Sequence, residues 1–226
     1  MDQVKQHFEK EAREFDEIIL QLIPYYEEIV EAALTIIQYD NEARLKVMDL
    51  GCGTGTLAQK IKEKYPNSRI TCVDIAQNML KMAQSKLQNY SGISYQNEDF
   101  QELEFESEYD VIISSLALHH LKKDKQKKQF YKKIYKALAE EGIFINADMV
   151  LASNEEVQKV YMEKWKSFMQ KNVSKKEVEN KWIPKYHQED WPVKMMQHIQ
   201  WLQNIGFKEV DVVWKYYNYA VYTGKK

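Results

Sequence analysis

The sequence of 226 residues predicts an α/β fold, in which a mostly parallel sheet carries helices on both faces. From Lys46 onward, short apolar segments alternate with longer amphipathic segments, as strands and helices do in β-α-β units. Glycine or acidic residues stand at the ends of the first three apolar segments, where α/β sheets bind ligands. The 44% hydrophobic and 29% charged residues exclude a disordered chain.

The charge and cysteine content of the sequence indicate which binding partners and which cellular compartment to expect. The 32 basic and 34 acidic residues nearly balance, so we expect no nucleic acid or anionic membrane as partner. No apolar run approaches the roughly 18 residues of a membrane span, and the N-terminus lacks the apolar core of a secretory signal. The two cysteines, Cys52 and Cys72, exclude a disulfide framework and a cysteine-rich zinc site. These features favour a cytoplasmic location for the protein.

Residues 1–40 are predicted to form a helical cap of two helices. Pro24 separates them, because proline lacks the amide hydrogen that a helix interior needs. The apolar residues that recur at helical spacing before this break are Phe8, Ala12, Phe15, Ile19 and Leu22.

Five strands and the helices between them follow the cap. The strands are predicted at residues 47–50, 69–74, 93–96, 109–115 and 142–146. The helix before the fifth strand carries its apolar stripe on Phe130, Ile134 and Leu138. Its lysine run, residues 122–128, is predicted to be a solvated outer face, with an RNA-binding patch as the alternative.

The remainder is interpreted as part of the same single domain, 1–226. Residues 152–196 form a lysine-rich helical insertion with Trp165, Trp182 and Trp191. A helix then ends at Gly206, which suits a left-handed C-cap, and two closing strands follow at 210–214 and 217–222.

The glycine turn after the first strand is the strongest local motif. Gly51, Gly53 and Gly55 follow the apolar segment 47–50 and precede a helix. Glycines permit a tight turn and let a ligand approach the backbone, and the helix N-terminus offers free amides to a carboxylate or phosphate. The spacing is G-x-G-x-G, which differs from the dinucleotide motif G-x-G-x-x-G.

Acidic residues end the next two strands. Asp74 stands 23 positions after Gly51, where a carboxylate can accept hydrogen bonds from ribose hydroxyls or, alternatively, cap the next helix. Asn97, Glu98, Asp99 and Phe100 follow the third strand, where a carboxylate can accept from a purine amine beside an aromatic ring. The alternative there is an acidic surface loop.

These motifs resemble the class I S-adenosylmethionine-dependent methyltransferase family. The resemblance rests on Asp-Leu-Gly-Cys-Gly-Thr-Gly, Val-Asp-Ile-Ala-Gln-Asn-Met-Leu, Asn-Glu-Asp-Phe and Ser-Leu-Ala-Leu-His-His-Leu. The helical cap resembles that of a subgroup of small bacterial and archaeal members. The resemblance implies a Rossmann-like three-layer sandwich with a seven-stranded, mostly parallel sheet and an antiparallel last strand. It also implies S-adenosylmethionine as cofactor and S-adenosylhomocysteine as product.

The resemblance further assigns roles to residues at the strand ends. Asp49 and the backbone of Gly51, Gly53 and Gly55 would hold the methionine moiety, and Asp74 the ribose. The residues implied to contact the adenine are Ile75, Met79, Asp99 and Phe100, and those implied to line the methionine pocket are Ser115 and Leu116.

The catalytic candidates are His119, His120 and Tyr26. The histidine pair follows the fourth strand, and a histidine suits a general base at neutral pH; packing or capping is the alternative. Tyr26 is interpreted as a ligand for the acceptor or the cofactor carboxylate, or as core. Asp148, just past the fifth strand, is predicted either to orient an amine or hydroxyl of the substrate or to cap the next segment. No metal site is expected, because the other histidines are isolated.

We therefore predict a methyltransferase acting on a small-molecule acceptor, as a monomer or homodimer. One alternative is a carboxy-S-adenosylmethionine synthase, which needs a cation for the added carboxylate; arginine is rare, with only Arg13, Arg44 and Arg69. Others are an RNA-modifying enzyme and a non-catalytic protein that binds S-adenosylmethionine.

Overall fold

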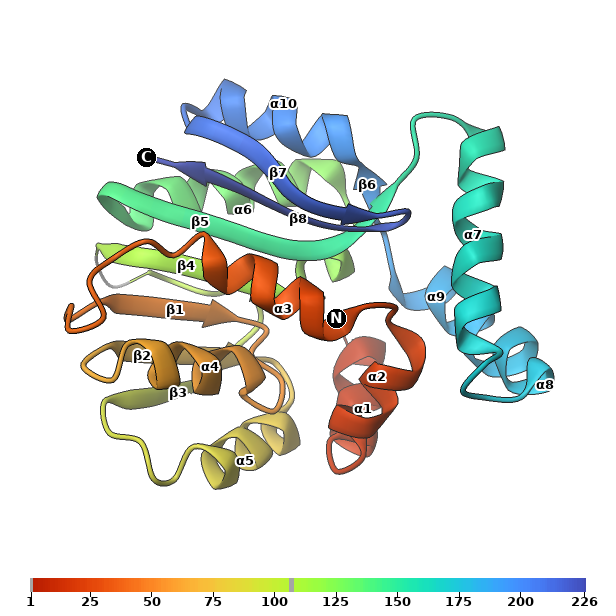
Figure 1. Ribbon diagram of the computed structural model, residues 1–226, viewed down its shortest axis with the longest axis horizontal. Coiled ribbons are helices and arrows are strands. Elements are labelled where there is room, and N and C mark those ends of the chain that lie inside the picture. The colour runs from red at the N-terminus through yellow and green to blue at the C-terminus, as the bar shows by residue number, and fades with distance from the viewer. Residues whose placement is uncertain (1, 106–107) are drawn as a thin grey trace.

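The computed structural model describes residues 2–105 and 108–226, and it confirms the predicted α/β sandwich. Seven strands follow the order β3-β2-β1-β4-β5-β8-β7, with parallel pairing from β3 to β5 and β8 antiparallel to both neighbours (Figure 1). The strands are β1 Lys46–Leu50, β2 Arg69–Asp74, β3 Ile93–Asn97, β4 Tyr109–Ser115, β5 Leu138–Leu151, β7 Lys208–Tyr216 and β8 Tyr219–Lys225. A short β6, Val193–Lys194, pairs with β5.

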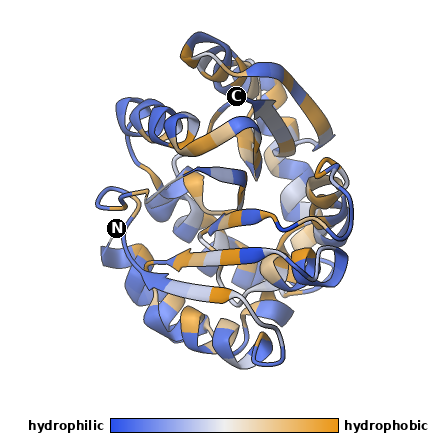
Figure 2. Cartoon of the chain, turned by 90° about the vertical axis from the view of Figure 1, so that its left-hand side faces the viewer, coloured by the Kyte–Doolittle hydropathy of each residue, from blue (hydrophilic) through white to orange (hydrophobic). Residues whose placement is uncertain are grey.

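Helices cover both faces of the sheet because its strands are apolar on both sides. In β1, Val47 packs toward α3 Tyr26–Thr35, α4 Thr56–Lys64 and α5 Gln77–Lys86, while its neighbour Met48 packs toward the opposite face. That opposite face holds α6 Asp124–Ala137 and α10 Met195–Ile205. Figure 2 shows apolar strands between helices whose outer sides are hydrophilic.

The order of strands reverses between β1 and β4, and this reversal positions the site. The chain winds outward from β1 through β2 to β3 and then crosses to β4 on the other side of β1. The helices that follow β1 and β4, α4 and α6, lie on opposite faces of the sheet, which leaves a crevice at the C-terminal ends of the strands.

The N-terminal cap contains three helices, so the prediction of two was wrong. The stripe from Phe8 to Leu22 divides into α1 Asp2–Glu11 and α2 Phe15–Leu22, with a turn closed by the Glu14 amide on the Glu11 carbonyl (3.0 Å). This turn lets α1 reach α5, where the Glu9 carboxylate accepts the amides of Gln77 and Asn78 at 2.7 and 2.8 Å.

The segment after β5 is helical, and it stands beside the cap (Figure 1). It contains α7 Glu155–Met169, α8 Lys175–Glu177, a π-helical turn η2 Val178–Trp182 and α9 Ile183–Glu189. The indole of Trp165 in α7 donates to the Leu22 carbonyl at 2.8 Å, which joins this segment to α2.

The ends of α6 and α10 differ in how closely they follow the sequence patterns. The helix predicted to include Leu138 ends at Ala137, because Leu138 is extended and pairs with Tyr109 as the first residue of β5. Gly206 ends α10 with a φ of 119°, the left-handed cap that its position predicts.

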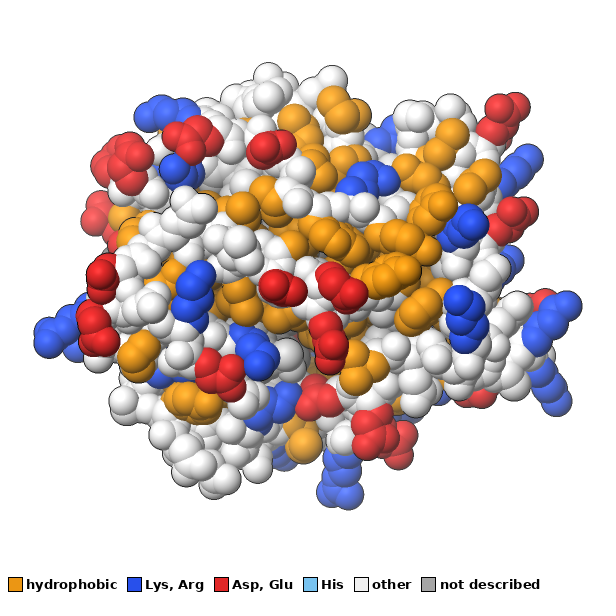
Figure 3. All heavy atoms as spheres, in the orientation of Figure 1, with side chains coloured by type: hydrophobic (Ala, Val, Ile, Leu, Met, Phe, Trp, Pro, Cys, Tyr) orange, Lys and Arg blue, Asp and Glu red, His pale blue; other side chains and the backbone are white. Residues whose placement is uncertain are grey.

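The surface carries one visible apolar area. Figure 3 shows hydrophobic side chains gathered across the middle of the face seen in Figure 1. The half-exposed large hydrophobic residues of the chain include Leu20, Tyr25 and Val160. In residues 2–105 and 108–226, no helix combines the length and apolarity that a membrane crossing requires.

Candidate active site

The glycine turn after β1 brings three backbone segments together. Gly51 has a φ of 69°, and a Cβ there would lie 2.2 Å from the Ala117 Cβ, so only glycine lets the loop after β4 approach. Gly55 has a φ of 85°, and its Cβ would meet Leu87 at 2.9 Å. Gly55 therefore serves the packing of α4 on α5, while Gly51 and Gly53 line a cavity.

Asp49 faces this cavity with an uncompensated charge. Its side chain is fully buried, and neither carboxylate oxygen has a hydrogen bond of ordinary geometry within the described residues. Burial and the charge of Asp74 raise the pKa of Asp49 to about 7, and the Ala58 amide offsets this only in part. A buried carboxylate of this kind fits a cationic ligand group such as an α-ammonium.

Asp74 lines the same cavity and is held in place by two backbone amides. Its Oδ2 accepts from the Gly53 amide at 2.9 Å, and its Oδ1 accepts from the Ala76 amide at 2.8 Å. Burial nevertheless raises the pKa of Asp74 to about 6. The first turn of α5 is capped by Glu9 instead, so Asp74 remains directed at the cavity.

Most residues assigned by resemblance to the cofactor meet around this cavity. Ile75, Met79, Phe100, Ser115 and Leu116 line it together with Asp49 and Asp74. Asp99 is not among the lining residues, because it turns back to accept the Gln101 amide at 2.9 Å; its neighbour Glu98 lines the cavity.

The cap supplies a wall of the cavity that the motifs did not reveal. Phe8, Phe15 and Ile19 line it from α1 and α2, and Tyr26 lines it from α3. The amphipathic spacing of the first three residues was the signal for such a role. The Tyr26 hydroxyl bonds to Thr56, and burial raises the pKa of Tyr26, so this phenol stays neutral beside the cofactor cavity.

A second cavity adjoins the first and has a mainly apolar wall. Phe8, Phe15, Ile19, Leu116 and His120 line both cavities. The second cavity extends under the helical segment after β5, where its further apolar lining comprises Ile18, Leu22, Ile23, Met149, Trp165, Trp182 and Tyr186. Of the three tryptophans in residues 152–196, Trp191 lies elsewhere, under the ammonium of Lys122.

His119 lies between two carboxylates at the polar end of the second cavity. Its Nδ1 bonds to Asp148 Oδ1 at 2.5 Å, and its Nε2 lies 3.5 Å from Asp190 Oδ1. Burial disfavours the imidazolium, but the charges of Asp148 and Asp190 outweigh it and raise the pKa of His119 to about 10. His119 is therefore a fixed cation at neutral pH, a state that cannot accept a proton.

His120 has the opposite protonation state. Its Nδ1 donates to the Glu189 carbonyl at 2.9 Å, and burial together with the charge of His119 lowers its pKa. The ring is therefore neutral near pH 7, and the Nε2 lone pair has no hydrogen-bond partner within the described part of the chain. Of the two histidines, His120 is therefore the one that can accept a proton at neutral pH.

Lys127 supports the turn that carries both histidines, and the prediction of a solvated lysine face was wrong for this residue. It lies three residues before Phe130 on the apolar side of α6 and is only 1% exposed. Its ammonium donates to the carbonyls of Leu118 and His119 at 3.1 and 3.2 Å and also to that of Leu121. These bonds hold the 3₁₀ turn η1 Leu118–His120.

A polar cluster connects α1 to α9 at the rim of the second cavity. His7 bonds to Glu11 through Nε2 and to Glu189 through Nδ1, both at 2.6 Å. Lys185 lies 3.1 Å from Glu11 and also contacts His7. We call these four residues the α1–α9 latch.

Comparison with known proteins agrees with this geometry. Residues 47–142 match the family described as a methyltransferase domain. The carboxy-S-adenosyl-L-methionine synthase of Campylobacter hominis is 29% identical over 100% of this chain and 97% of its own length. The malonyl-[acyl-carrier protein] O-methyltransferase of Bacillus cereus is 32% identical over 48% of this chain and 39% of its own.

Solved structures share the fold at low identity. Human N-acetylserotonin methyltransferase, solved with S-adenosylmethionine, matches with a TM-score of 0.64 and 18% identity over 98% of this chain and 56% of its own. DhpI, solved as a SAM-HEP complex, matches with a TM-score of 0.66 and 17% identity over 98% of this chain and 95% of its own.

The fold and the matched segment define a methyltransferase-type enzyme, and its cavity lies at the strand ends. The chain is similar to methyltransferase domains in sequence over residues 47–142, and it is similar to S-adenosylmethionine-dependent methyltransferases in fold along nearly its whole length.

Proposed function

We propose that this enzyme transfers the methyl group of S-adenosylmethionine to a small, largely apolar acceptor that carries one hydroxyl or amine. The observation that supports this most is the position of His120, which lines both the cofactor cavity and the apolar cavity beside it. A neutral histidine at this junction has the acceptor on one side and the cofactor on the other. The cofactor, when bound, supplies an electrophilic methyl group on sulfur.

The residues of the chain then bind the cofactor, orient the acceptor and remove its proton. Asp49 offers its carboxylate to the amino group of the methionine moiety, and Asp74 offers its remaining acceptor capacity to the ribose hydroxyls. Phe8, Phe15 and Leu116 exclude water from the junction, which preserves alignment of donor and acceptor. His120 takes the proton of the acceptor at Nε2.

The second candidate is carboxy-S-adenosylmethionine synthesis, which the similarity to the Campylobacter hominis enzyme along the whole chain supports. That reaction needs a cation for a carboxylate. Arg13, Arg44 and Arg69 line neither cavity. The cations that line the second cavity are already paired, Lys185 with Glu11 and His119 with Asp148 and Asp190. Because these cations already have carboxylate partners, the cavity offers none to an added carboxylate, which favours methyl transfer.

Mass spectrometry distinguishes the two reactions. The enzyme is incubated with S-adenosylmethionine and a panel of phenols, amines and thiols, and separately with prephenate. Methyl transfer predicts a methylated acceptor together with S-adenosylhomocysteine, and carboxylation predicts a heavier cofactor. His120→Gln should slow methyl transfer about 100-fold or more, whereas the exposed control His187→Gln should not. Formation of either product would exclude a non-catalytic protein that only binds the cofactor.

Location and assembly belong to the same proposal. Cys52 and Cys72 are both free and buried, which suits a reducing cytoplasm. We infer a monomer or homodimer that acts on a small molecule instead of nucleic acid.

A further inference from the structure

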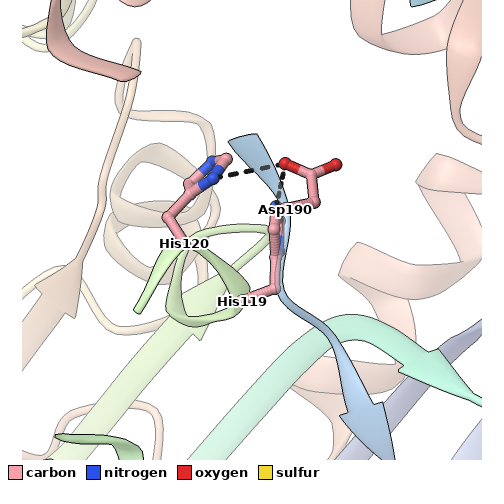
Figure 4. A group of neighbouring side chains, drawn as sticks. All are labelled: His119, His120 and Asp190. Atoms are coloured by element: carbon pink, nitrogen blue, oxygen red, sulfur yellow. Dashed lines mark ion pairs between the residues drawn. The ribbon is translucent and has the colours of Figure 1, made fainter. Parts of the chain in front are cut away.

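Two histidines and one aspartate meet at the polar end of the second cavity, although Asp190 is distant from the histidine pair in the sequence. Figure 4 shows both imidazole rings directed at the Asp190 carboxylate. We propose that His119, His120 and Asp190 bind one divalent first-row transition-metal ion. Its binding is independent of the proposed function, whereas its role toward the acceptor rests on that function.

The distances between the donor atoms fit a single ion. Asp190 Oδ1 lies 3.5 Å from His119 Nε2 and 3.3 Å from His120 Nδ1, and all three residues offer ligand atoms within 4.8 Å of one another. Zinc bonds to nitrogen and oxygen of about 2.0–2.1 Å place neighbouring ligands of a tetrahedron about 3.3–3.4 Å apart. The Glu189 carbonyl oxygen, 2.9 Å from His120 Nδ1, is a further oxygen near the same point.

Asp148 orients the first of these ligands. It accepts from His119 Nδ1 at 2.5 Å and is itself held by the Met149 amide at 2.9 Å, which leaves His119 Nε2 directed at Asp190. Metal-binding histidines usually donate their second ring nitrogen to a carboxylate in this way. Asp148 is 2% exposed and His119 is 7% exposed, so packing fixes this arrangement.

The donor set selects the class of ion. Two imidazoles and one carboxylate suit zinc, iron, cobalt or manganese, whereas magnesium and calcium prefer oxygen ligands alone. Without an ion, the same space holds the protons that His119 and His120 direct at Asp190. All three ligands line the apolar cavity, so an oxygen atom of the acceptor can complete the coordination and become more acidic. With the ion on His120 Nδ1 the ring proton lies on Nε2, so in the ion-bound enzyme the ion replaces Nε2 in the loss of the acceptor proton.

Metal titration tests the site directly. The full chain is dialysed against a chelator and titrated with Co²⁺, followed by visible absorption, and with Zn²⁺, followed by calorimetry. We expect one ion per chain with ligand-field bands of a nitrogen- and oxygen-coordinated Co²⁺, and no comparable binding of Mg²⁺. Asp190→Asn and His120→Asn should each weaken binding at least tenfold, and Asp148→Asn about 10- to 100-fold.

The controls distinguish loss of the metal site from misfolding of a variant and from failure of the proposed function. His187→Gln leaves the exposed surface without a histidine and should bind the ion as the native chain does. Circular dichroism and binding of S-adenosylhomocysteine report whether each variant is folded. A native chain that binds S-adenosylhomocysteine but not Co²⁺ or Zn²⁺ overturns the metal site alone, as does binding that Asp190→Asn and His120→Asn leave unchanged. Bound metal without methyl transfer would instead count against the proposed function.

Discussion

Asp49 and Asp74 are buried carboxylates at the ends of neighbouring strands, and the charge of Asp74 disfavours ionisation of Asp49 in the cavity that both line. In the cofactor-free protein this arrangement costs stability, because a buried charge without a partner is unfavourable. It becomes favourable when a cationic group enters the cavity. The two residues therefore connect the stability of the enzyme with its affinity for the cofactor.

Asp49→Asn should separate these two properties. The variant keeps the side-chain shape but removes the buried charge, so we expect an unchanged or higher melting temperature, by about 2–4 °C for each kcal/mol gained. The affinity for S-adenosylmethionine should fall about 10- to 100-fold, since a charge-assisted hydrogen bond is lost. Thermal melts and calorimetry measure the two effects. Loss of stability together with unchanged affinity would contradict this account.

Cofactor affinity should depend on pH through the same pair. Both carboxyl pKa values are raised, to about 7 for Asp49 and about 6 for Asp74, so Asp49 takes up its proton around neutral pH and Asp74 at lower pH. Protonated Asp49 cannot pair with an ammonium, and affinity should therefore fall from about pH 8 to about pH 5. Calorimetry across this range is the measurement. In Asp49→Asn the fall should begin about one pH unit lower, where only Asp74 titrates; an identical profile would exclude Asp49.

The parts of the fold that the sequence predicts well are those governed by local patterns. The glycine turn, Asp74 and Phe100 reach one cavity because strand ends of a parallel sheet meet at the same edge. Asp190 could not be associated with His119 in advance, because only the path of the segment after β5 brings them together. The turn between α1 and α2 has no proline or glycine to mark it.

Lys127 illustrates a different reason for error. Charge alone favours solvent, but the carbonyls of the η1 turn satisfy its ammonium inside the protein. Position 127 shares a helix face with Phe130, and the spacing was the better guide than the residue type.

Replacing Lys127 should destabilise the histidine turn. Lys127→Met retains the aliphatic stem but removes the ammonium from the carbonyls of Leu118, His119 and Leu121. The first two keep a backbone amide as donor, so we expect a total cost of about 1–3 kcal/mol. We expect a lower free energy of unfolding in urea and a weaker acceptor turnover. Lys132→Met, on the exposed side of α6, is the matched control and should unfold like the native chain. Equal stability of the two variants would show that the buried ammonium contributes nothing.

The α1–α9 latch should open as the pH rises. Burial disfavours charged His7, but its bonds to Glu11 and Glu189 outweigh this and raise its pKa. Burial likewise opposes ionisation of Glu11, but His7 and Lys185 lower the pKa of Glu11 to about 2. The charged groups that face His7 are thus Glu11, Glu189 and Lys185, while Lys181 approaches Glu11 at 3.5 Å.

The direction of the effect follows from these shifts. A histidine with a raised pKa contributes stability below its unfolded value of about 6.5 and loses it as the pH rises through the folded value. A carboxyl group with a lowered pKa contributes above about 4.5 and fails only near pH 2. The latch is therefore strongest between about pH 4.5 and pH 6.5 and weakens above that window.

Hydrogen exchange of α1 and α9 measures this opening. Rates corrected for intrinsic pH dependence should rise between about pH 6 and about pH 8.5 in the native chain, while α4 stays unchanged. His7→Gln cannot become charged, so its α1 and α9 should exchange quickly throughout and lose the pH dependence. His187→Gln, also in α9 but exposed, should behave like the native protein. If His7→Gln retains the native pH profile, the latch is held by Lys185 and Glu11 without His7.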